Sequence, residues 1–466
     1  MTDSFTLFLN DSSIQINPNK AFKHLTNQQL YFVGSLKNEF TDSIQLNQTI
    51  EFITTIDTNA KFSIISDSIL LDKIQYTTFK YFWDFAHPTS GLARERNSDL
   101  TTVTIGGSGF GIMAIPVAVE RRFISYQDGL TRIKKIIDFL KNKADKFHGA
   151  FPHWLNGETG KVIPFGQKDN GADLVETSYL VAGLYTIRQY FNGNNNVEIK
   201  LRNDINTIIQ NVEWAWFRKN NENVLYWHWS PNYNWEMNFP IRGWNECLIT
   251  YILAASSITY PIPDTVYNLG WAKNGGIKNG NNYYGNTLPL GENLGGPLFF
   301  SHYSFLGINP HNLRDKYANY ETQVVNHSLI NYNYCVQNPN HYAGYGSQCW
   351  GLTASDIQNG YTASSPTNDQ SFISPTAALS SMPYTPQQSL QAMRYFYYVL
   401  GDKIWGEYGF VDAFSLEKNW FASSYLAIDQ GPIIIMIENY RSNLIWNLTM
   451  SCEEIKNGLR KLAFNF

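Results

Sequence analysis

Carboxylic acids stand beside turns and aromatic residues in three stretches of the sequence, and the first stretch holds a cluster. Asp169, Asp173 and Glu176 follow one another at spacings of four and three residues around a turn at Gly171. Because residues three or four apart share one face of a helix, we expect the three carboxylates to converge on one wall of a cleft. A simpler interpretation is that Asp173 only caps the following helix, with Glu176 as a favourable acid in its first turn.

The second stretch joins a run of aromatic residues to a single acid. Residues 226–235 contain three tryptophans, two tyrosines and one histidine, and residues 243–246 read Gly-Trp-Asn-Glu at the start of an apolar helix. Aromatic faces can stack on sugar rings, and partial burial among them would raise the pKa of Glu246, as a general acid requires. Alternatively, the aromatic residues fill the core and Glu246 is only a favourable charge at a helix N-terminus.

The third stretch, residues 425–432, holds Asp429 between an apolar run and a Gly-Pro turn, directly before an apolar helix. Such an acid is either a helix cap or a positioned catalytic base. Glycoside hydrolysis needs one carboxylic acid that protonates the leaving oxygen and one carboxylate that acts as base or nucleophile. We therefore expect Glu246 to supply the proton and Asp429 to activate water, directly or through a substrate hydroxyl. The cluster of Asp169, Asp173 and Glu176 would bind sugar hydroxyls or share the proton network.

Side chains close to these acids are expected to hold the sugar. The candidates share an aromatic ring, an imidazole or a guanidinium group, and they are His153, Trp154, Trp227, His228, Trp229, Tyr233, Trp244 and Arg94. For Arg94, an ordinary internal salt bridge is the alternative. The histidines lack an HExxH spacing and the four cysteines lack a CxxC pair, so we expect neither a metal ion nor another cofactor.

The elements that must position these residues change character near residue 68. Before that point apolar and polar residues alternate, which predicts a small β-rich appendage in residues 1–68. In residues 69–466, helical spacing of apolar residues recurs between long loops rich in Gly, Asn and Tyr. This mainly α pattern predicts a toroid of paired helices whose loops build a cleft at one end. An α-solenoid is the rival fold, but no repeated sequence period supports it.

Composition excludes several other classes of protein. The 466 residues carry 35 Lys and Arg against 39 Asp and Glu, a net charge of -4, without a basic run suited to a phosphate backbone, so nucleic acid is not an expected partner. No apolar stretch approaches the roughly 18 residues of a membrane span. The first residues lack signal-peptide features, so we expect a cytoplasmic protein if the sequence is complete, and a periplasmic or secreted one if a leader was removed.

Seven motifs occur in a fixed order, at residues 82–88, 104–110, 151–157, 173–177, 227–233, 349–356 and 427–440. Together they resemble the glycoamylase-like domain family that contains the bacterial endo-β-1,2-glucanases. The resemblance covers residues 70–462 and implies an (α/α)6 barrel and inverting hydrolysis of β-1,2-glucan or sophoro-oligosaccharides without a metal ion. It also implies that the same acids lie in the cleft, namely Asp169, Asp173, Glu176, Glu246 and Asp429.

The resemblance leaves other functions open. Where many relatives have Gly-Tyr-Asn-Glu, this chain has a tryptophan at Trp244, which keeps the acid and changes the ring before it. The family also includes exo-acting forms, so an exo-acting or glucoamylase-like hydrolase of another glucan is one alternative. A noncatalytic glycan-binding protein of an uptake system is another, although a binder would gain little from five desolvated carboxylates.

Overall fold

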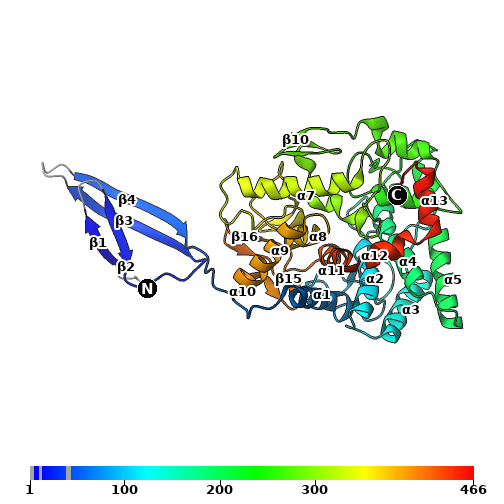
Figure 1. Cartoon of the computed structure of the whole chain (residues 1–466), viewed down its shortest axis with the longest axis horizontal. Coiled ribbons are helices and arrows are strands. Elements are labelled where there is room, and N and C mark those ends of the chain that lie inside the picture. The colour runs from blue at the N-terminus through cyan, green and yellow to red at the C-terminus, as the bar shows by residue number, and fades with distance from the viewer. Residues whose placement is uncertain (1–4, 10–12, 38–42) are drawn as a thin grey trace.

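The computed structural model describes residues 5–9, 13–37 and 43–466. In this part of the chain, N-terminal strands project from one side of a large body that is mostly helical (Figure 1). The mainly α class and the small N-terminal strand region are as the sequence pattern predicts. No helix among the described residues combines the length and the apolar character that crossing a membrane would require.

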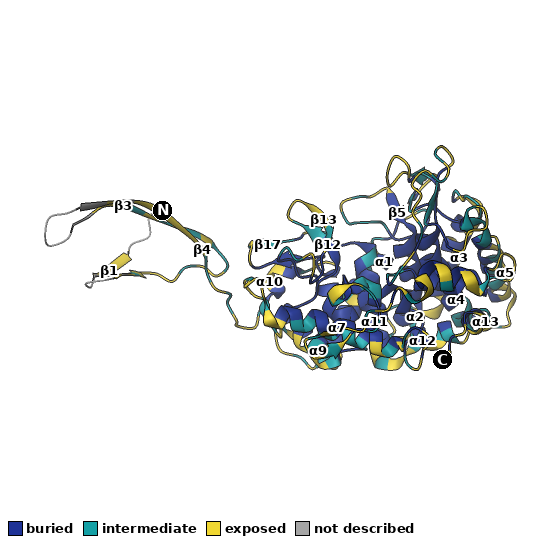
Figure 2. Cartoon of the chain, turned by 90° about the horizontal axis from the view of Figure 1, so that it is seen from above, coloured by how far each residue is buried: buried dark blue, intermediate teal, exposed yellow. Residues whose placement is uncertain are grey.

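The described N-terminal strands form two antiparallel hairpins. Their bounds are β1 (Phe5–Leu9), β2 (Ile14–Pro18), β3 (Asn27–Lys37) and β4 (Ser43–Ile53). The hairpins are largely open to solvent (Figure 2), and even the apolar side chains of Tyr31 and Val33 are 63% and 83% exposed. The first helix starts at Asp67, two residues before the expected start at residue 69, where Ser66 accepts a hydrogen bond from the Ile69 backbone N–H.

The described helices follow in chain order. Their bounds are α1 (Asp67–Trp83), α2 (Ile105–Glu120), α3 (Tyr126–Asn142), α4 (Leu174–Tyr190), α5 (Asn196–Gln210), α6 (Leu248–Ser256), α7 (Tyr320–Gln337), α8 (Pro375–Ser380), α9 (Pro386–Arg394), α10 (Gly401–Ile404), α11 (Ala427–Ser442), α12 (Leu444–Met450) and α13 (Glu453–Lys461). For residues 297–306 the spacing of apolar residues in the sequence predicts a helix, but this segment forms two short 3-10 turns, Leu298–Ser301 and Tyr303–Phe305, between glycines at 296 and 307. Helix α11 begins before the Gly-Pro pair, so Asp429 lies in its first turn rather than ahead of it.

Burial separates an inner from an outer set of helices. All of α6, residues 105–118 of α2, residues 174–187 of α4 and most of α11 are buried. Helices α3, α5 and α13 bury one stripe and expose the opposite face. Because a helix that is apolar all round belongs in the interior, the inner set forms the core and the amphipathic set covers it.

Glycines allow the inner helices α2 and α4 to approach closely. A Cβ atom at Gly109 would lie 2.4 Å from the backbone oxygen of Tyr179, and one at Gly183 would lie 2.4 Å from the backbone oxygen of Gly109. This contact fixes the start of α4, which carries Asp173 and Glu176, relative to the start of α2.

Short strands occur in the loops between the helices. Their bounds are β5 (Thr102–Thr104), β6 (Trp154–Asn156), β7 (Val162–Ile163), β8 (Ala172–Asp173), β9 (His228–Trp229), β10 (Asn282–Tyr283), β11 (Asn286–Thr287), β12 (Ala354–Ile357), β13 (Gly360–Ala363), β14 (Trp405–Gly406), β15 (Gly409–Phe410), β16 (Phe414–Ser415) and β17 (Trp420–Phe421). Strands β5, β12, β13 and β17 lie along one edge of the helical body (Figure 2). The loops that carry them supply the walls of the cleft described next.

Candidate active site

A cleft with a volume of about 420 Å³ is lined by loops that lie far apart in the sequence. Its walls include the segment after α1, the starts of α2 and α4, the β6 and β9 regions, the turn that leads into α6, and the β12–β13 hairpin. Two of the predicted acids, Glu176 and Glu246, line this cleft. Asp169, Asp173 and Asp429 are buried and are not among the lining residues.

Glu246 faces the cleft from the turn that leads into α6. The turn is held by Asn245, whose Oδ1 accepts hydrogen bonds from the Cys247 backbone N–H (3.1 Å) and from Trp271 Nε1 (3.0 Å). Burial raises the pKa of Glu246 to about 7, and the negative charges of Glu176 and Asp173 act in the same direction. A carboxyl group with this pKa is partly protonated at neutral pH and can donate a proton to a leaving oxygen.

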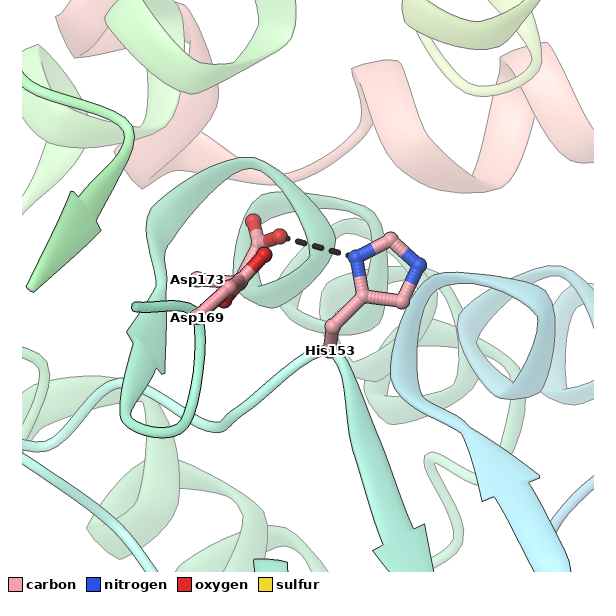
Figure 3. A group of neighbouring side chains, drawn as sticks. All are labelled: His153, Asp169 and Asp173. Carbon is pink, nitrogen blue, oxygen red and sulfur yellow. Dashed lines mark hydrogen bonds and ion pairs between the residues drawn. The ribbon is translucent and has the colours of Figure 1, made fainter. Parts of the chain in front are cut away.

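The 169–176 cluster is built around Asp173 at the start of α4. Asp173 Oδ1 accepts hydrogen bonds from the backbone N–H groups of Val175 (3.0 Å) and Glu176 (2.9 Å), so this residue is the helix cap of the simpler interpretation. Its other oxygen accepts a hydrogen bond from His153 Nδ1 at 3.0 Å (Figure 3). Asp173 therefore caps the helix and also joins the cluster.

Charges in this cluster are arranged around the imidazole of His153. Although burial lowers the pKa of His153, the charge of Glu176, the hydrogen bond to Asp173 and the charge of Asp169 together raise it to about 9. Burial and the charge of Asp173 raise the pKa of Asp169 to about 7. Burial would raise the pKa of Asp173 too, but the contact with His153 lowers it. At neutral pH, a His153–Asp173 ion pair thus lies beside acids that retain part of their protons.

Glu176 lies between this cluster and the start of α2. Its Oε2 accepts a hydrogen bond from the Gly106 backbone N–H at 2.7 Å, and a Cβ atom at Gly106 would lie 2.5 Å from the same oxygen. Burial and the charge of Asp173 raise the pKa of Glu176, while the contact with Gly106 opposes the shift. Only glycine at position 106 leaves room for the carboxylate in this place.

Ligand atoms of His153, Asp169 and Asp173 lie within 4.8 Å of one another (Figure 3), a spacing that a metal ion could bridge. The hydrogen bond between His153 Nδ1 and Asp173 Oδ2 occupies one of these atoms on each residue. The second oxygen of Asp173 is committed to capping α4. The interaction that the structure shows in this group is therefore the shared proton between His153 and Asp173.

Asp429 belongs to a second acidic group, at the start of α11. Its side chain is 2% exposed and neighbours Asp412, which is equally buried. Burial and the charge of Asp412 raise the pKa of Asp429 well above its usual value. Burial and the charge of Asp356 raise the pKa of Asp412 to about 7. Because like charges at close range cannot both ionise readily, the pair retains a proton at neutral pH.

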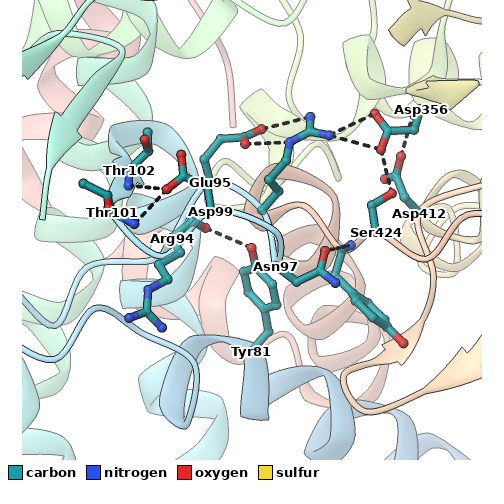
Figure 4. A network of polar contacts seen from close by, with 12 residues as sticks. Tyr81, Arg94, Glu95, Asn97, Asp99, Thr101, Thr102, Asp356, Asp412 and Ser424 are labelled. Atoms are coloured by element: carbon teal, nitrogen blue, oxygen red, sulfur yellow. Dashed lines mark hydrogen bonds and ion pairs between the residues drawn. The ribbon is translucent and has the colours of Figure 1, made fainter. Parts of the chain in front are cut away.

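A polar network joins Asp412, one member of this pair, to the cleft (Figure 4). The Arg96 guanidinium contacts Glu95 at 2.8 Å and Asp356 at 3.3 Å. Ser424 Oγ donates to Asp356 at 2.6 Å, and the Asp356 backbone N–H donates to Asp412 Oδ2 at 2.6 Å. Glu95 and Arg96 line the cleft, so the network connects the buried Asp412 to the surface that a ligand would contact.

Tyr303 lines the cleft and lies within the electrostatic influence of both predicted catalytic acids, Glu246 and Asp429. Burial raises the pKa of its hydroxyl, and the charges of Asp429 and Glu246 both raise it further. By contrast, the acids that act on the pKa of Glu246 are Glu176 and Asp173. The pairing of Glu246 with Asp429 as acid and base therefore stays a prediction.

Three of the predicted sugar-binding residues, His153, Trp154 and Trp227, line the cleft. His228 lies behind this wall, with its Nε2 atom 3.4 Å from Asp169 Oδ2. Trp229 is not a lining residue, and its ring packs edge-on against Trp216 at 5.4 Å.

The remaining predicted sugar-binding residues also lie outside the lining. Trp244 is 6% exposed and packs against Trp271 and Phe305. The hydroxyl of Tyr233 accepts a hydrogen bond from Gln167 at 3.3 Å. Arg94 donates to backbone oxygens of Phe85 and Leu100 and stacks on the Phe85 ring, so it stabilises the loop after α1.

Sequence reasoning missed several lining residues, namely Glu95, Phe165, Phe299, Tyr303 and Tyr361. Arg96, two positions after the predicted Arg94, is the arginine of this segment that lines the cleft, whereas Arg94 packs on Phe85. Tyr303 and Tyr361 lie in segments without an acidic cluster, so no local pattern marked them.

Several known proteins resemble this chain over most of its length. Residues 238–453 match the family model Glycoamylase, described as "Putative glucoamylase". A solved endo-β-1,2-glucanase from Chitinophaga pinensis, in complex with sophorotriose and glucose, is 56% identical with a TM-score of 0.85, over 86% of this chain and 99% of that chain. A solved β-1,2-glucanase from Parabacteroides distasonis is 40% identical with a TM-score of 0.83, over 97% of this chain and 71% of that chain.

A curated relative, also from Parabacteroides distasonis, is named exo β-1,2-glucooligosaccharide sophorohydrolase (non-reducing end). It is 46% identical over 423 residues, which make up 85% of this chain. The chain spans 58% of the length of that relative. The solved relative from Chitinophaga pinensis is 56% identical and is covered over 99% of its own length, which confirms the resemblance seen in the sequence motifs. The chain therefore belongs to the glycoamylase family.

Proposed function

We propose that this protein is a glycoside hydrolase that cleaves β-1,2-glucan or sophoro-oligosaccharides with inversion of configuration. The observation that carries the proposal is the cleft itself, where the pKa of Glu246 is raised to about 7 among aromatic side chains and further acids. Such a carboxyl group is suited to general acid catalysis at neutral pH. The endo-β-1,2-glucanase that is 56% identical supports the choice of linkage.

In the proposed reaction, the proton of Glu246 passes to the glycosidic oxygen as the bond between that oxygen and C1 breaks. A water molecule attacks C1 from the opposite face, and its proton passes to Asp429, which must be ionised for this step, with the proton that the pair retains on Asp412. Because Asp429 is buried and does not line the cleft, a substrate hydroxyl or a second water relays this proton. Glu176 and His153, which line the cleft, bind sugar hydroxyls, and Asp169 and Asp173 behind them share the proton network. Burial raises the pKa of Glu246, and the charges of Glu176 and Asp173 add to the shift.

The helices of the body define the fold through their pairing. We propose that the inner helices, including α2, α4, α6 and α11, pair with the outer ones as an (α/α)6 barrel, with the cleft at one end. We also propose that residues 1–68 form an appendage separate from the catalytic part, residues 69–466. The change from solvent-exposed hairpins to buried helices supports this division.

Both endo and exo action are compatible with this site, and relatives with either name occur. A noncatalytic glycan-binding protein is the second class of function. It would need Trp154 and Trp227 in the cleft wall but would gain nothing from an acid with a pKa of about 7. The raised pKa of Glu246 therefore favours the enzyme.

The direct experiment is incubation of the purified chain with β-1,2-, β-1,3-, β-1,4- and α-1,4-glucans, with reducing ends and product sizes followed over time. We expect release of products from the β-1,2-glucan. The Glu246→Gln variant should lose at least about 100-fold in kcat, because it keeps the shape of the side chain and removes the proton donor.

Two matched variants sharpen this test. Asp429→Asn should also lose turnover, whereas Glu438→Gln alters an equally buried acid of the same helix that pairs with Arg121 away from the cleft and should retain kcat. Near-normal turnover in both Glu246→Gln and Asp429→Asn would reject the assignment and make Asp173 and Glu176 the candidates.

A further inference from the structure

A second hollow lies directly beside the cleft. It has a volume of about 500 Å³, and Arg96 and Tyr361 line both cavities. Its other walls come from the β12–β13 hairpin and from the segment that contains β17. Because the two cavities share these side chains, a chain of sugars that leaves the cleft past Tyr361 enters the hollow.

Aromatic rings in the hollow are held in fixed positions. Trp420 and Phe421 form β17, which pairs with β16. The Trp420 ring packs edge-on against Phe372, with the ring centres 5.3 Å apart. Tyr361 stands on β13 and is 50% exposed. A half-buried ring with one packed edge can offer an apolar face to a ligand without losing conformational freedom when the ligand binds.

The turn before Trp420 is tied to the N-terminal appendage. Asn419 adopts a left-handed backbone conformation with a φ of 46°, and its Nδ2 atom donates to the Leu25 backbone oxygen (3.0 Å) and to Asn27 Oδ1 (3.3 Å). Asn419 precedes Trp420 directly, so these contacts help to fix the rim of the hollow.

The polar groups of the hollow favour a neutral ligand. The charge of Arg96 is balanced by Glu95 and Asp356, so an anion would meet a guanidinium that is already paired. Asp356 and the hydroxyl of Ser424 are within reach of the same space. Rings together with paired donors and acceptors are suited to the C–H face and the hydroxyl groups of a glucosyl unit.

We propose that this hollow is a further glucosyl-binding subsite, in which Trp420 stacks on a sugar unit of a β-1,2-glucan chain that extends past Tyr361. The proposal rests on the proposed function of the cleft and adds the chain length that the site recognises. Short oligosaccharides that fill only the cleft do not reach Trp420, so its contribution grows with the length of the glucan.

The kinetic test compares long β-1,2-glucan with sophorotriose in the full-length chain. Trp420→Ala should raise KM for the long glucan about tenfold, the size expected for loss of a ring contact, and leave kcat unchanged. KM for sophorotriose should stay within about twofold. Trp420→Phe keeps an aromatic face and should restore most of the affinity. Trp235→Ala removes a half-buried ring outside both cavities and should not separate the two substrates.

A binding test separates this proposal from the proposed function. Calorimetry with the Glu246→Gln variant, with and without Trp420→Leu, measures affinity for long glucan and sophorotriose without turnover. Leucine keeps apolar volume beside Phe372, so this variant also covers the case in which Trp420→Ala fails to fold. Equal effects on both ligands, or no effect on the long glucan, would overturn the subsite. If the wild-type chain binds long glucan tightly through Trp420 but does not hydrolyse it, the proposed function is rejected and the subsite is kept.

Discussion

Neighbouring residues divide the tasks in the short turn that leads into α6. Asn245 holds the turn through the Cys247 backbone and the Trp271 indole, and this leaves the Glu246 carboxyl facing the cleft. Trp244 is packed into the core instead of facing a ligand. The tryptophan at this position therefore contributes to the packing beneath the acid and not to the surface that a sugar would contact.

The raised pKa of Glu246 predicts the pH dependence of activity. A general acid must carry its proton, so kcat should fall as the pH rises above about 7, where Glu246 ionises. A pH profile of kcat with β-1,2-glucan measures this limb. Undiminished kcat up to pH 9 would show that another group donates the proton.

His153 should make stability depend on pH. The pKa of this group rises from 6.5 to about 9 on folding, so its contribution is fully present below pH 6.5 and is lost as the pH rises through about 9. We expect the wild-type Tm to fall across this window. The His153→Asn variant lacks the titrating group and should show a smaller fall. Parallel Tm curves for the two proteins would contradict the ion pair with Asp173.

At the scale of elements, the acids are positioned by helix starts. Asp173 caps α4, Glu176 reaches the start of α2, and Asp429 lies in the first turn of α11. The sequence indicated the first two through the spacing of acids after a turn. It placed Asp429 before its helix, because a Gly-Pro pair usually marks a boundary. Here Pro432 is accommodated within the helix.

The close contact of α2 and α4 can be tested by adding one methyl group. Gly109→Ala would place its Cβ 2.4 Å from the Tyr179 backbone oxygen, and overpacking of this kind costs about 1–3 kcal/mol or more. We expect a clear fall in Tm and, because the helix starts shift, in kcat. Gly346→Ala meets no atom within 4 Å and has no positive φ, so it is the matched control. Equal melting of the two variants would refute the close approach.

At the scale of the whole molecule, patterning was enough to predict the division into strands and helices, because alternation and helical spacing are local properties of the sequence. The lining of the cleft was not predictable in the same way. Tyr303 and Tyr361 reach it from a 3-10 turn and a hairpin that only the closed fold brings near Glu246. The aromatic run at 226–235 reaches the cleft through Trp227, whereas the rings of Trp229 and Trp235 pack on Trp216.

The appendage contacts the body next to Trp420, through the bonds between Asn419 and the backbone of Leu25. Asn419→Ala should therefore weaken binding of long glucan modestly, by loosening the rim of the second hollow, and leave sophorotriose unaffected. Calorimetry with the two ligands measures the difference. An unchanged affinity for the long glucan would mean that β16 and β17 hold Trp420 without help from the appendage.

The central claim is that this site hydrolyses the β-1,2-glucosidic bond with inversion. Proton NMR of the reaction with β-1,2-glucan, recorded before the anomers equilibrate, tests it most directly. New reducing ends should appear first as the α-anomer, and the Glu246→Gln variant should not produce them. First appearance of the β-anomer would contradict inversion, and the absence of any new reducing end would contradict the assignment of this substrate.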